Sequence, residues 1–368
     1  MAEIAAVPGH GLRVASLFAG AGGSCLGYRM AGYRILWANE FIEAARHTYR
    51  ANNPTTLLDP RDIRTIDPQD ILTACDLVPG ELDLLDGSPP CASFSTAGKR
   101  AKGWGQVKAY SDTKQRTDDL FFEYARLLEG LQPKVFVAEN VSGLVKGVAK
   151  GYFKQILARL RACGYTVEAR LLDAQWLGVP QARQRIFFVG VRADLPRAPA
   201  FPQPLPYRYS VRDALPWIVR GKYGPTWRQA DLPSPTVSAG LSYKPETSHQ
   251  NLELVEAETD IARYAIGREW NTLQPGEKSA KYFSLQKPAL DKPSPTMTAP
   301  ASLISAAAIV HPLEKRYFSI AELKRLGSFP DDFQLTGTYA QQWERIGRAV
   351  PPVMMAHLAR TIAEKVLL

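Results

Sequence analysis

The sequence predicts an α/β protein in which a doubly wound, mostly parallel sheet is joined to a second, smaller, irregular and strand-rich domain. Short apolar runs alternate with helical segments from Arg13 to Arg192, and this alternation is typical of a parallel sheet with helices on both faces. From about Leu195 prolines become dense and the alternation stops, which predicts a domain boundary. We therefore expect a first domain over residues 1–195, a second over 196–312, and a C-terminal segment, 313–368, that returns to the first.

The composition favours an intracellular protein with a negatively charged partner. The chain has 368 residues, a formal net charge of +9 and four cysteines. The excess of positive charge favours a polyanion such as a nucleic acid. The cysteines form no C-x-x-C pair, so we expect neither a disulfide framework nor a metal site. No apolar run is long enough to cross a membrane and no basic-then-apolar leader is present, so we expect a soluble, cytoplasmic protein.

The first strand and the turn after it predict a nucleoside-binding unit. An apolar run, Arg13–Phe18, ends in the glycine-rich Ala19–Gly23, and a helical segment follows. The next strand, Tyr33–Ala38, is followed by Glu40, about twenty residues after the first glycine, where such units place an acid that accepts from ribose hydroxyls. Phe41 is placed to stack on an adenine. These features favour a bound adenosine moiety over a plain tight turn, but they do not separate a nicotinamide cofactor from S-adenosylmethionine.

A stiff loop is predicted around Cys91. The apolar run Leu82–Leu85 reads as a buried strand, and it breaks into Asp86-Gly87-Ser88-Pro89-Pro90-Cys91. Two consecutive prolines cannot continue a central strand, so Cys91 is expected at the carboxyl end of the sheet, where open α/β sheets bind ligands. On this loop alone, Cys91 is either a nucleophile or a free cysteine that serves as a small apolar residue.

Three further segments bring polar groups toward the same edge. Residues 97–117 form a long basic connection with glycines, which predicts a mobile lid over a phosphate backbone or a merely solvated loop. Glu139 directly follows the strand Lys134–Ala138, so we expect it to be partly buried and suited to exchanging a proton. Arg183 and Arg185 alternate on an extended segment and are expected to face one side, together with Gln181.

Together these segments resemble the DNA (cytosine-5) methyltransferase family. The ordered set is Phe18–Gly23, Asn39-Glu40, Pro89–Ser95, Glu139–Val141 and Gln181–Arg185, with Arg325–Asp331 and Gly347–Pro352 similar to the last two motifs of the family. Any one motif is weak evidence, but this many in one order are very improbable by chance. The resemblance covers about Arg13–Arg192 and Arg316 to the C-terminus. It implies a Rossmann-like fold that binds S-adenosylmethionine.

The resemblance also implies a covalent mechanism. Carbon 5 of cytosine is too weak a nucleophile to attack a methyl sulfonium, whereas a thiolate that adds to carbon 6 converts the ring into an enamine that can. Cys91 fits this nucleophile. On the family's pattern Glu139 holds ring nitrogen 3 and the exocyclic amine, Arg185 contacts the carbonyl oxygen, and Arg183 and Gln181 orient the site. The target base must be flipped out of duplex DNA, and the basic loop would hold the distorted strand.

The same resemblance assigns a set of residues to the cofactor: Phe18, Gly20, Gly22, Glu40, Phe41, Asp62, Ile63, Arg348 and Val350. Two positions depart from the family. Ala92 stands where the family often has glutamine, so lid contacts would differ. Arg348 stands where the family usually has asparagine, and a cation near a sulfonium is unfavourable. We therefore expect Arg348 to pair with an acidic protein group or a cofactor carboxylate; a weaker extension is acceptance of a carboxylate-bearing cofactor analogue.

The second domain resembles in position the target-recognition region of the family. Aromatic and basic residues interleave there, and the DNA contacts we expect across the chain are Ser95, Lys99, Arg100, Gln181, Tyr243 and Lys244. Two similar segments, Pro233–Ala239 and Pro293–Ala299, each follow an aspartate. Their hydroxyls either bind phosphates or belong to a repeated scaffold turn.

The leading interpretation is a bacterial-type DNA cytosine-5 methyltransferase that acts as a monomer on double-stranded DNA at the nucleoid, with or without a cognate restriction endonuclease acting separately. A tRNA cytosine-5 methyltransferase is an alternative, against which the large second domain argues. A nicotinamide-dependent oxidoreductase would leave the Pro-Pro-Cys, Glu-Asn-Val and paired-arginine segments unexplained. A catalytically dead DNA-binding relative is a further alternative, although Cys91 and Glu139 are both present.

Overall fold

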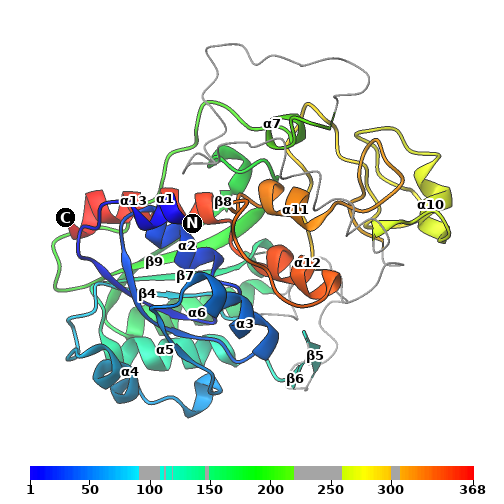
Figure 1. Ribbon diagram of the computed structural model, residues 1–368. Coiled ribbons are helices and arrows are strands. Elements are labelled where there is room, and N and C mark those ends of the chain that lie inside the picture. The colour runs from blue at the N-terminus through cyan, green and yellow to red at the C-terminus, as the bar shows by residue number, and fades with distance from the viewer. Residues whose placement is uncertain (91–107, 112, 118, 146–148, 219–258, 300–306) are drawn as a thin grey trace. The chain divides into compact units, whose positions relative to one another are not determined.

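A computed structural model describes residues 1–90, 108–111, 113–117, 119–145, 149–218, 259–299 and 307–368 (Figure 1). The chain divides into two units, each assembled from separate stretches of sequence. Unit 1 comprises Met1–Ile4, Asp173–Arg183 and Pro204–Met354, and unit 2 comprises Ala5–Leu172, Gln184–Gln203 and Met355–Leu368. These bounds differ from the expected domains in four places. Met1–Ile4, Asp173–Arg183 and most of the segment 313–368 belong to unit 1, and residues 196–203 belong to unit 2.

Unit 2 is built on a seven-stranded sheet with the order β3-β2-β1-β4-β7-β9-β8. The strands are β1 (Arg13–Leu17), β2 (Arg34–Asn39), β3 (Leu57–Asp59), β4 (Leu84–Gly87), β7 (Val135–Val141), β8 (Tyr165–Asp173) and β9 (Gln184–Arg192); β5 (Lys108–Tyr110) and β6 (Thr113–Gln115) form a separate antiparallel pair. The first five strands of the large sheet pair in parallel, and β9 runs antiparallel to β7. The prediction of a mostly parallel sheet is confirmed. The strand order reverses between β1 and β4, and ligands bind beside such a reversal at the carboxyl ends of the strands.

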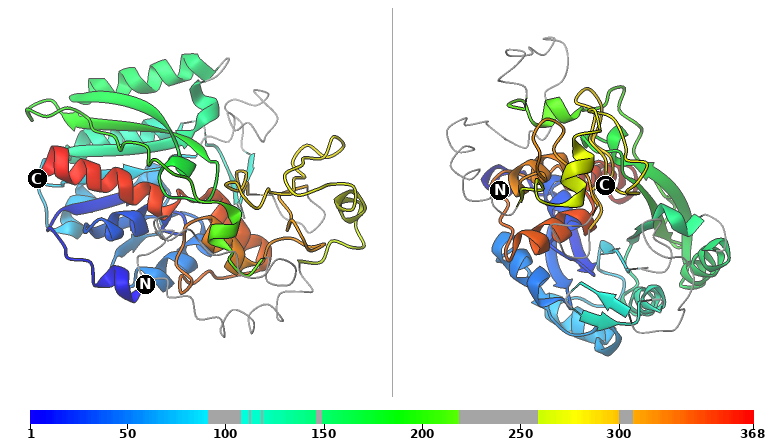
Figure 2. Two further views of the ribbon diagram at one scale, coloured as in Figure 1. Left: turned by 90° about the horizontal axis from the view of Figure 1, so that it is seen from above. Right: turned by 90° about the vertical axis from the view of Figure 1, so that its right-hand side faces the viewer.

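Helices cover both faces of this sheet (Figure 2). One face carries α4 (Pro68–Cys75), α5 (Leu120–Leu131) and α6 (Ala149–Ala162), and the other carries α2 (Gly23–Met30), α3 (Glu43–Asn52) and α13 (Pro352–Ile362). The α4 helix begins in a capping box formed by Asp67 and Asp70, with Pro68 at its first position. The turns η1 (Ile63–Thr65) and η3 (Ser142–Val145) connect the elements, and a π-helical turn, Ala363–Leu367, follows α13.

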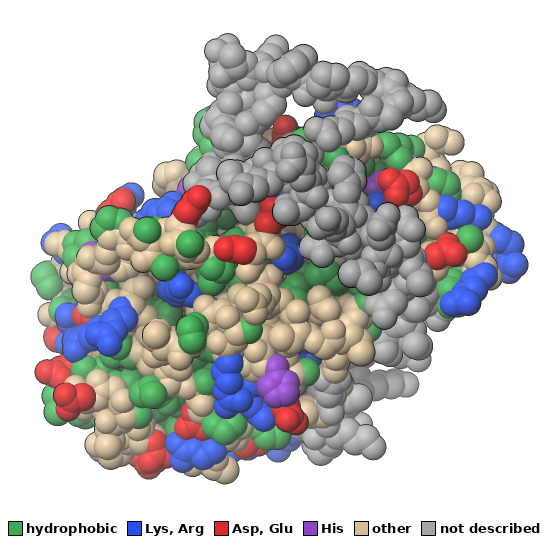
Figure 3. Space-filling view, viewed as in Figure 1, with side chains coloured by type: hydrophobic (Ala, Val, Ile, Leu, Met, Phe, Trp, Pro, Cys, Tyr) green, Lys and Arg blue, Asp and Glu red, His purple; other side chains and the backbone are tan. Residues whose placement is uncertain are grey.

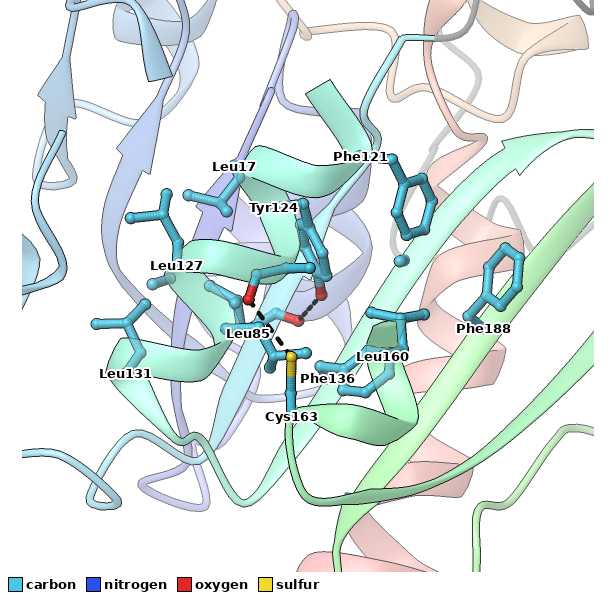
Figure 4. Close-up of a cluster of buried hydrophobic side chains, with 14 of the residues drawn as sticks. Leu17, Leu85, Phe121, Tyr124, Leu127, Leu131, Phe136, Leu160, Cys163 and Phe188 are labelled. Carbon is cyan, nitrogen blue, oxygen red and sulfur yellow. Dashed lines mark hydrogen bonds between the residues drawn. The ribbon is translucent and has the colours of Figure 1, made fainter. Parts of the chain in front are cut away.

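The core under α5 fixes the end of β4 (Figure 4). Tyr124 is fully buried, and its hydroxyl lies 3.2 Å from the carbonyl oxygens of both Leu85 on β4 and Val137 on β7. A Cβ built on Gly87 would lie 2.6 Å from the Tyr124 ring, so β4 can end in this packed position only with glycine. This packing sets the point from which the chain leaves the sheet toward Cys91.

The C-terminal residues complete unit 2. Tyr33 donates its hydroxyl hydrogen to the carbonyl of Ala359 at 3.0 Å, and Arg360 donates to the carbonyl of Met30 at 3.0 Å. The return of the C-terminus to the first domain is therefore seen for residues 355–368, but not for the stretch before them.

Unit 1 contains the short helices η4 (Ala174–Trp176), α7 (Val211–Ala214), α10 (Ala265–Trp270), α11 (Ile320–Leu326) and α12 (Tyr339–Arg348). Of α1 (Ala2–Ala5), the first three residues are assigned to unit 1 and Ala5 to unit 2. In the described part of 196–312 we find helices and isolated bridges rather than strands. The strand-rich character expected there is therefore wrong for that part. Its many prolines have no N–H group for a strand ladder, which explains the difference. Among the residues described, no helix is long and apolar enough to cross a membrane.

Candidate active site

The turn after β1 is held in a strained backbone conformation beside Glu40. Phe18, Gly20 and Gly22 have positive φ angles of 56°, 57° and 91°. A non-glycine residue in this region is strained, and such strain is concentrated at functional turns. The buried Glu40 accepts hydrogen bonds from the backbone N–H of Gly20 at 2.7 Å and of Ile42 at 2.6 Å. The predicted glycine turn and the predicted acidic residue thus form one hydrogen-bonded unit.

The same turn leaves room for a ligand. A Cβ built on Gly20 would meet no atom within 4 Å, so the backbone is open to close approach at this point. Phe41 directly follows Glu40 and is 41% exposed, which is high for a large apolar ring. An open backbone at Gly20, a fixed carboxylate on Glu40 and an exposed ring on Phe41 together suit the ribose and adenine of a cofactor that contains adenosine.

Asp62 and Ile63 lie in the next loop along this edge. Asn39, at the end of β2, donates to the carbonyls of Asp59 at 3.2 Å and Arg61 at 2.8 Å, which holds the loop beside β2. The Asp62 side chain caps η1, and Ile63 is buried. Seven of the expected cofactor residues therefore lie on the loops that follow β1, β2 and β3 of unit 2.

The chain that leads to Cys91 is anchored to β7. Asn140 is buried and donates from Nδ2 to the carbonyl of Pro89 at 3.2 Å, while its Oδ1 accepts from the N–H of Val141 at 2.8 Å. Cys91 follows Pro89 by two residues, a span of at most about 7 Å of chain. The predicted residues Cys91, Ser95, Lys99 and Arg100 themselves lie outside the described residues.

Glu139 and Arg185 form a buried ion pair on neighbouring strands. Arg185 on β9 lies opposite Val141 of β7, which makes Glu139 its diagonal neighbour. The Arg185 Nε atom lies 2.8 Å from Oε1 of Glu139, and Glu139 is 8% exposed. Burial lowers the pKa of Arg185, and the adjacent carboxylate opposes that shift. The burial expected for Glu139 is confirmed, although Glu139 lies inside β7 rather than just beyond it.

A second carboxyl lies buried in the same sheet. Asp86 on β4 is 1% exposed, and it accepts hydrogen bonds from the hydroxyls of Ser16 at 2.8 Å and Tyr28 at 3.2 Å. Burial, with a contribution from the charge of Glu139, raises the pKa of Asp86 to about 7. Through its hydrogen bond with Tyr28, Asp86 links β4, which leads to Cys91, to α2, which follows the glycine turn.

Arg183 and Arg185, which the sequence pattern placed on one side, bind different partners. Arg185 lies on β9 and pairs with Glu139, whereas Arg183 precedes β9, which begins at Gln184. Arg183 is 1% exposed, and its Nη1 donates to the carbonyls of Met297 at 3.1 Å and Gly347 at 2.9 Å within unit 1. These contacts fit a residue that positions backbone segments rather than one that touches the base.

Gln181 likewise serves the framework of unit 1. It is 1% exposed and pairs as an isolated bridge with Ser294. The Thr296 hydroxyl donates to the carbonyl of Ala182 at 2.6 Å. These contacts favour the scaffold interpretation of the segment Pro293–Ala299. The other predicted elements of this region, Pro233–Ala239, Tyr243 and Lys244, lie outside the described residues.

Arg348 has an acidic partner one helical turn earlier on α12. Its Nε lies 2.7 Å from Oε1 of Glu344, and Arg345 Nη2 lies 3.2 Å from the other oxygen of the same carboxylate. The expected pairing of Arg348 with an acidic protein group is confirmed. Arg348 and the buried Val350 belong to unit 1, so their place at the cofactor stays a prediction.

Comparison with known families identifies this arrangement. Residues 12–364 match the family model described as C-5 cytosine-specific DNA methylase. The chain belongs to this family. The resemblance inferred from the ordered motifs is confirmed, and the chain is a DNA cytosine methyltransferase. The nicotinamide-dependent alternative is wrong, because the methylase family accounts for nearly the whole chain.

Known members of the methylase family match along most of their length. The Type II methyltransferase M.DdeI of Desulfomicrobium norvegicum is 30% identical over 96% of this chain and 88% of its own length. The Type II methyltransferase M.PspPI of a Psychrobacter species is 31% identical over 98% and 81%. The crystal structure described as a DNA modification methyltransferase of an E. coli prophage shares the fold with a TM-score of 0.71 at 21% identity, over 97% of this chain and all of that one.

Three residues that contact the predicted site residues or the strand leading to Cys91 were missed by the motif analysis. Asn140 stood inside a quoted motif, but its bond to Pro89 joins positions 51 residues apart and leaves no local signal. Glu344 could have been found, since Glu and Arg at i and i+4 of a helix pair regularly. Asp86 interrupts an apolar run, and a carboxyl at such a position predicts burial with specific hydroxyl partners.

Proposed function

We propose that this DNA cytosine methyltransferase flips its target cytosine out of double-stranded DNA, adds the Cys91 thiolate to carbon 6, and methylates carbon 5. S-adenosylmethionine, when bound, supplies the methyl group as a sulfonium. The observation that carries the proposal is the Asn140–Pro89 hydrogen bond beside the Glu139–Arg185 pair. It brings the approach to the nucleophile and the two base-binding side chains together at the edge where β4 and β7 end.

The chemistry requires both members of the ion pair. When the Cys91 sulfur bonds to carbon 6, the electron pair of the 5,6 double bond moves onto carbon 5 and, through the ring, toward nitrogen 3 and the carbonyl oxygen. Glu139 would hold nitrogen 3 and the exocyclic amine, and Arg185 would donate to the carbonyl oxygen. Carbon 5 would then take the methyl group from the sulfonium, whose methyl–sulfur bond breaks to leave the neutral thioether S-adenosylhomocysteine. A base would remove the carbon 5 proton, and that electron pair would restore the 5,6 double bond as the bond from carbon 6 to Cys91 breaks and the thiolate leaves.

The buried pair also orients its own members. A guanidinium has five donors in a fixed plane, so Arg185 can bind Glu139 through Nε and still present other N–H groups. The ion pair restricts the Glu139 carboxylate, which is largely buried, to a single orientation. Less side-chain entropy is therefore lost when the base binds. Glu139 and Arg185 are therefore proposed as catalytic residues, with Arg183 and Gln181 as positioning residues.

The cofactor and DNA assignments rest on separate parts of the chain. We assign the adenosine end of S-adenosylmethionine to the loops around Gly20, Glu40 and Asp62, with Phe41 against the adenine. The DNA contacts are assigned to the basic stretch 97–117 and to unit 1. The restriction-modification relatives support a role in sequence-specific DNA modification, with any cognate endonuclease acting as a separate protein and this chain acting as a monomer.

The decisive test identifies the methylated nucleoside that the enzyme forms. Genomic DNA is the substrate because it contains every short recognition sequence. The purified chain is incubated with tritiated S-adenosylmethionine and unmethylated genomic DNA, with tRNA in parallel, and the nucleosides are separated. We expect label in 5-methyldeoxycytidine. Label confined to tRNA would favour the tRNA alternative, and label in neither polymer would contradict the proposal.

The covalent step is tested with DNA made with 5-fluorodeoxycytidine. A fluorine on carbon 5 cannot leave as a proton does, so the enzyme stays bonded to carbon 6 after methyl transfer. Wild type and Cys75→Ser should form a complex that survives denaturing electrophoresis, because Cys75 is a half-buried cysteine on α4 with no assigned role. Cys91→Ser should form none while still binding DNA; a trapped complex with Cys91→Ser would remove Cys91 from the mechanism.

A further inference from the structure

Residues 276–287 of unit 1 form a tight, internally bonded turn. Lys278 and Gln286 pair as an antiparallel bridge. The N–H of Ser279 donates to the carbonyl of Leu285 at 2.9 Å, and the N–H of Lys287 donates to the carbonyl of Glu277 at 2.9 Å. The segment therefore has the hydrogen bonding of a short hairpin, with its tip between Ser279 and Leu285.

Two buried polar side chains fasten this turn to α10 and the loop after it. The Ser279 hydroxyl donates to Glu269 Oε1 on α10 at 2.7 Å and accepts from the N–H groups of Lys281 and Tyr282 at 3.0 and 2.9 Å. Lys287 is 4% exposed; its Nζ donates to the carbonyl of Leu273 at 2.7 Å. Because burying an ammonium group is costly, this arrangement indicates a turn that is built to keep one shape.

The rigid tip presents an apolar ring to solvent. Phe283 is 73% exposed, the highest value among the large apolar side chains of the described residues. The ammonium of Lys278 lies 4.1 Å from the centre of the Phe283 ring, and Lys281 two positions earlier is also exposed. The Lys281 ammonium lies 5.4 Å from the centre of the neighbouring Tyr282 ring. An exposed phenylalanine with one ammonium over its ring, at the tip of an internally bonded turn, is a poor arrangement for stability alone.

We propose that this turn is a DNA-contacting element: Phe283 packs against sugar and base edges in a groove of duplex DNA, and the exposed Lys278 and Lys281 contact nearby phosphates. The proposal rests on the proposed action on double-stranded DNA. It follows from the chemistry of the tip, because apolar rings that enter a groove and cations that hold the flanking backbone are a common combination in DNA-binding proteins.

The charge on this part of unit 1 favours DNA over a second copy of the chain. The surface around α10 carries both basic and acidic side chains (Figure 3); the exposed basic ones include Arg263, Arg268, Lys278 and Lys281, and the exposed acidic ones include Asp260 and Glu277. The exposed basic side chains outnumber the exposed acidic ones in this set, and a polyanion gains from each contact with a basic side chain by releasing its counterions. Keeping Phe283 in one place before binding also reduces the entropy lost on association.

The test separates the ring from the cations by salt dependence. Affinity for a duplex is measured by fluorescence anisotropy between 50 and 200 mM salt for wild type, Phe283→Ala and the double variant Lys278→Ala/Lys281→Ala. Phe283→Ala should weaken binding by about 5- to 100-fold with an unchanged salt slope, as for the loss of one stacked or inserted ring. The double variant should lower the slope of log affinity against log salt by about 2.

Matched controls come from unit 2, where Val78 is 58% exposed and Lys154 is an exposed lysine on α6. Val78→Ala and Lys154→Ala should leave affinity and slope as in wild type. A photo-crosslinking phenylalanine analogue at position 283 gives a second readout that does not depend on an alanine variant folding well, and it should join the protein to the duplex.

Each outcome is decisive. Wild-type affinity and slope in both sets of variants would overturn the assignment of the turn while leaving the methyltransferase proposal intact. Crosslinks only between two protein chains would assign Phe283 to self-association and also overturn it. A wild-type chain that neither binds nor methylates any duplex would contradict the proposed function itself, and the DNA-contacting turn with it.

Discussion

The buried carboxyl of Asp86 makes the stability of the folded protein depend on pH near neutrality. Its pKa is raised to about 7 in the folded chain, against 3.8 for an ordinary aspartate. The folded state therefore holds this proton more tightly than the unfolded state does. The resulting stabilisation is complete below about pH 4 and is lost as the pH rises to 7, with a total change of at most about 4 kcal/mol.

We expect Asp86→Asn to have a higher melting temperature than wild type at pH 8. The difference in melting temperature should shrink as the pH falls toward 5. An amide keeps an acceptor for Tyr28 and can donate to Ser16, but it carries no charge to bury. Differential scanning fluorimetry across this pH range measures the difference from wild type. A pH-independent difference would contradict the raised pKa.

Asp83, three residues earlier, is a control of opposite sign. It is paired with Arg13 at 3.2 Å and Lys134 at 2.7 Å, and these partners hold its pKa below the usual value despite its burial. Its contribution is present above pH 4 and is lost as the pH falls through the lowered pKa. Asp83→Asn should therefore destabilise the protein at pH 8, where Asp86→Asn stabilises it.

Arg348 and Glu344 define a second prediction at the level of side chains. On the predicted placement of Arg348 at the cofactor, Glu344 offsets a positive charge that would repel a sulfonium. Glu344→Gln should weaken S-adenosylmethionine binding, and adding Arg348→Asn to that variant should restore it, as measured by titration calorimetry. Equal affinity in wild type and both variants would place Arg348 away from the cofactor.

At the scale of secondary-structure elements, two helical glycines have opposite roles. A Cβ on Gly347 of α12 would lie 2.8 Å from the backbone N of Ala299 and 2.9 Å from the carbonyl of Thr298, neither of which can move freely. A Cβ on Gly151 of α6 would meet nothing within 4 Å. Helix propensity alone would make both substitutions favourable.

We therefore expect Gly347→Ala to destabilise the protein by about 1–3 kcal/mol through overpacking. Gly151→Ala should instead stabilise it by about 0.5 kcal/mol through the lower backbone entropy of the unfolded chain. Urea unfolding gives both values. Similar behaviour of the two variants would show that α12 does not pack tightly on residues 298 and 299.

The strands and helices of unit 2 were largely predictable, because local hydrophobic patterns along the sequence indicate their repeated alternation. The glycine turn, Glu40 and the buried Glu139 followed from their places at strand ends. The partners of Arg183 were not predictable, since the carbonyls of Met297 and Gly347 lie more than 100 residues away along the chain. Asn140 and Asp86 also escaped, since their partners come from other strands and helices.

At the scale of the whole molecule, the last fourteen residues matter more than their position suggests. Met355–Leu368 belong to unit 2, and Leu358 and Ile362 on α13 are fully buried. The contacts between residues 30–33 and 359–360 join positions more than 320 residues apart, and contacts of such long range are associated with slow folding.

Leu358→Ala is expected to cost about 2–5 kcal/mol, as for other large core residues. The exposed Glu364→Ala, six residues later, should change stability by less than about 0.5 kcal/mol. Denaturant unfolding of both variants measures the contrast. A small effect of Leu358→Ala would mean that α13 contributes little to unit 2.

On the proposal that unit 1 recognises the DNA, the hydrogen bonds from Arg183 to Met297 and Gly347 constrain how this enzyme can acquire a new recognition sequence. Pro204–Met354 is a single continuous stretch and would be the obvious module to exchange between related methylases. Its backbone carbonyls, however, are matched to a guanidinium that lies on Asp173–Arg183, outside that stretch. A chimaera in which Pro204–Met354 alone is exchanged would combine Arg183 with carbonyl groups from a different protein. Asp173–Arg183 should therefore be exchanged together with Pro204–Met354.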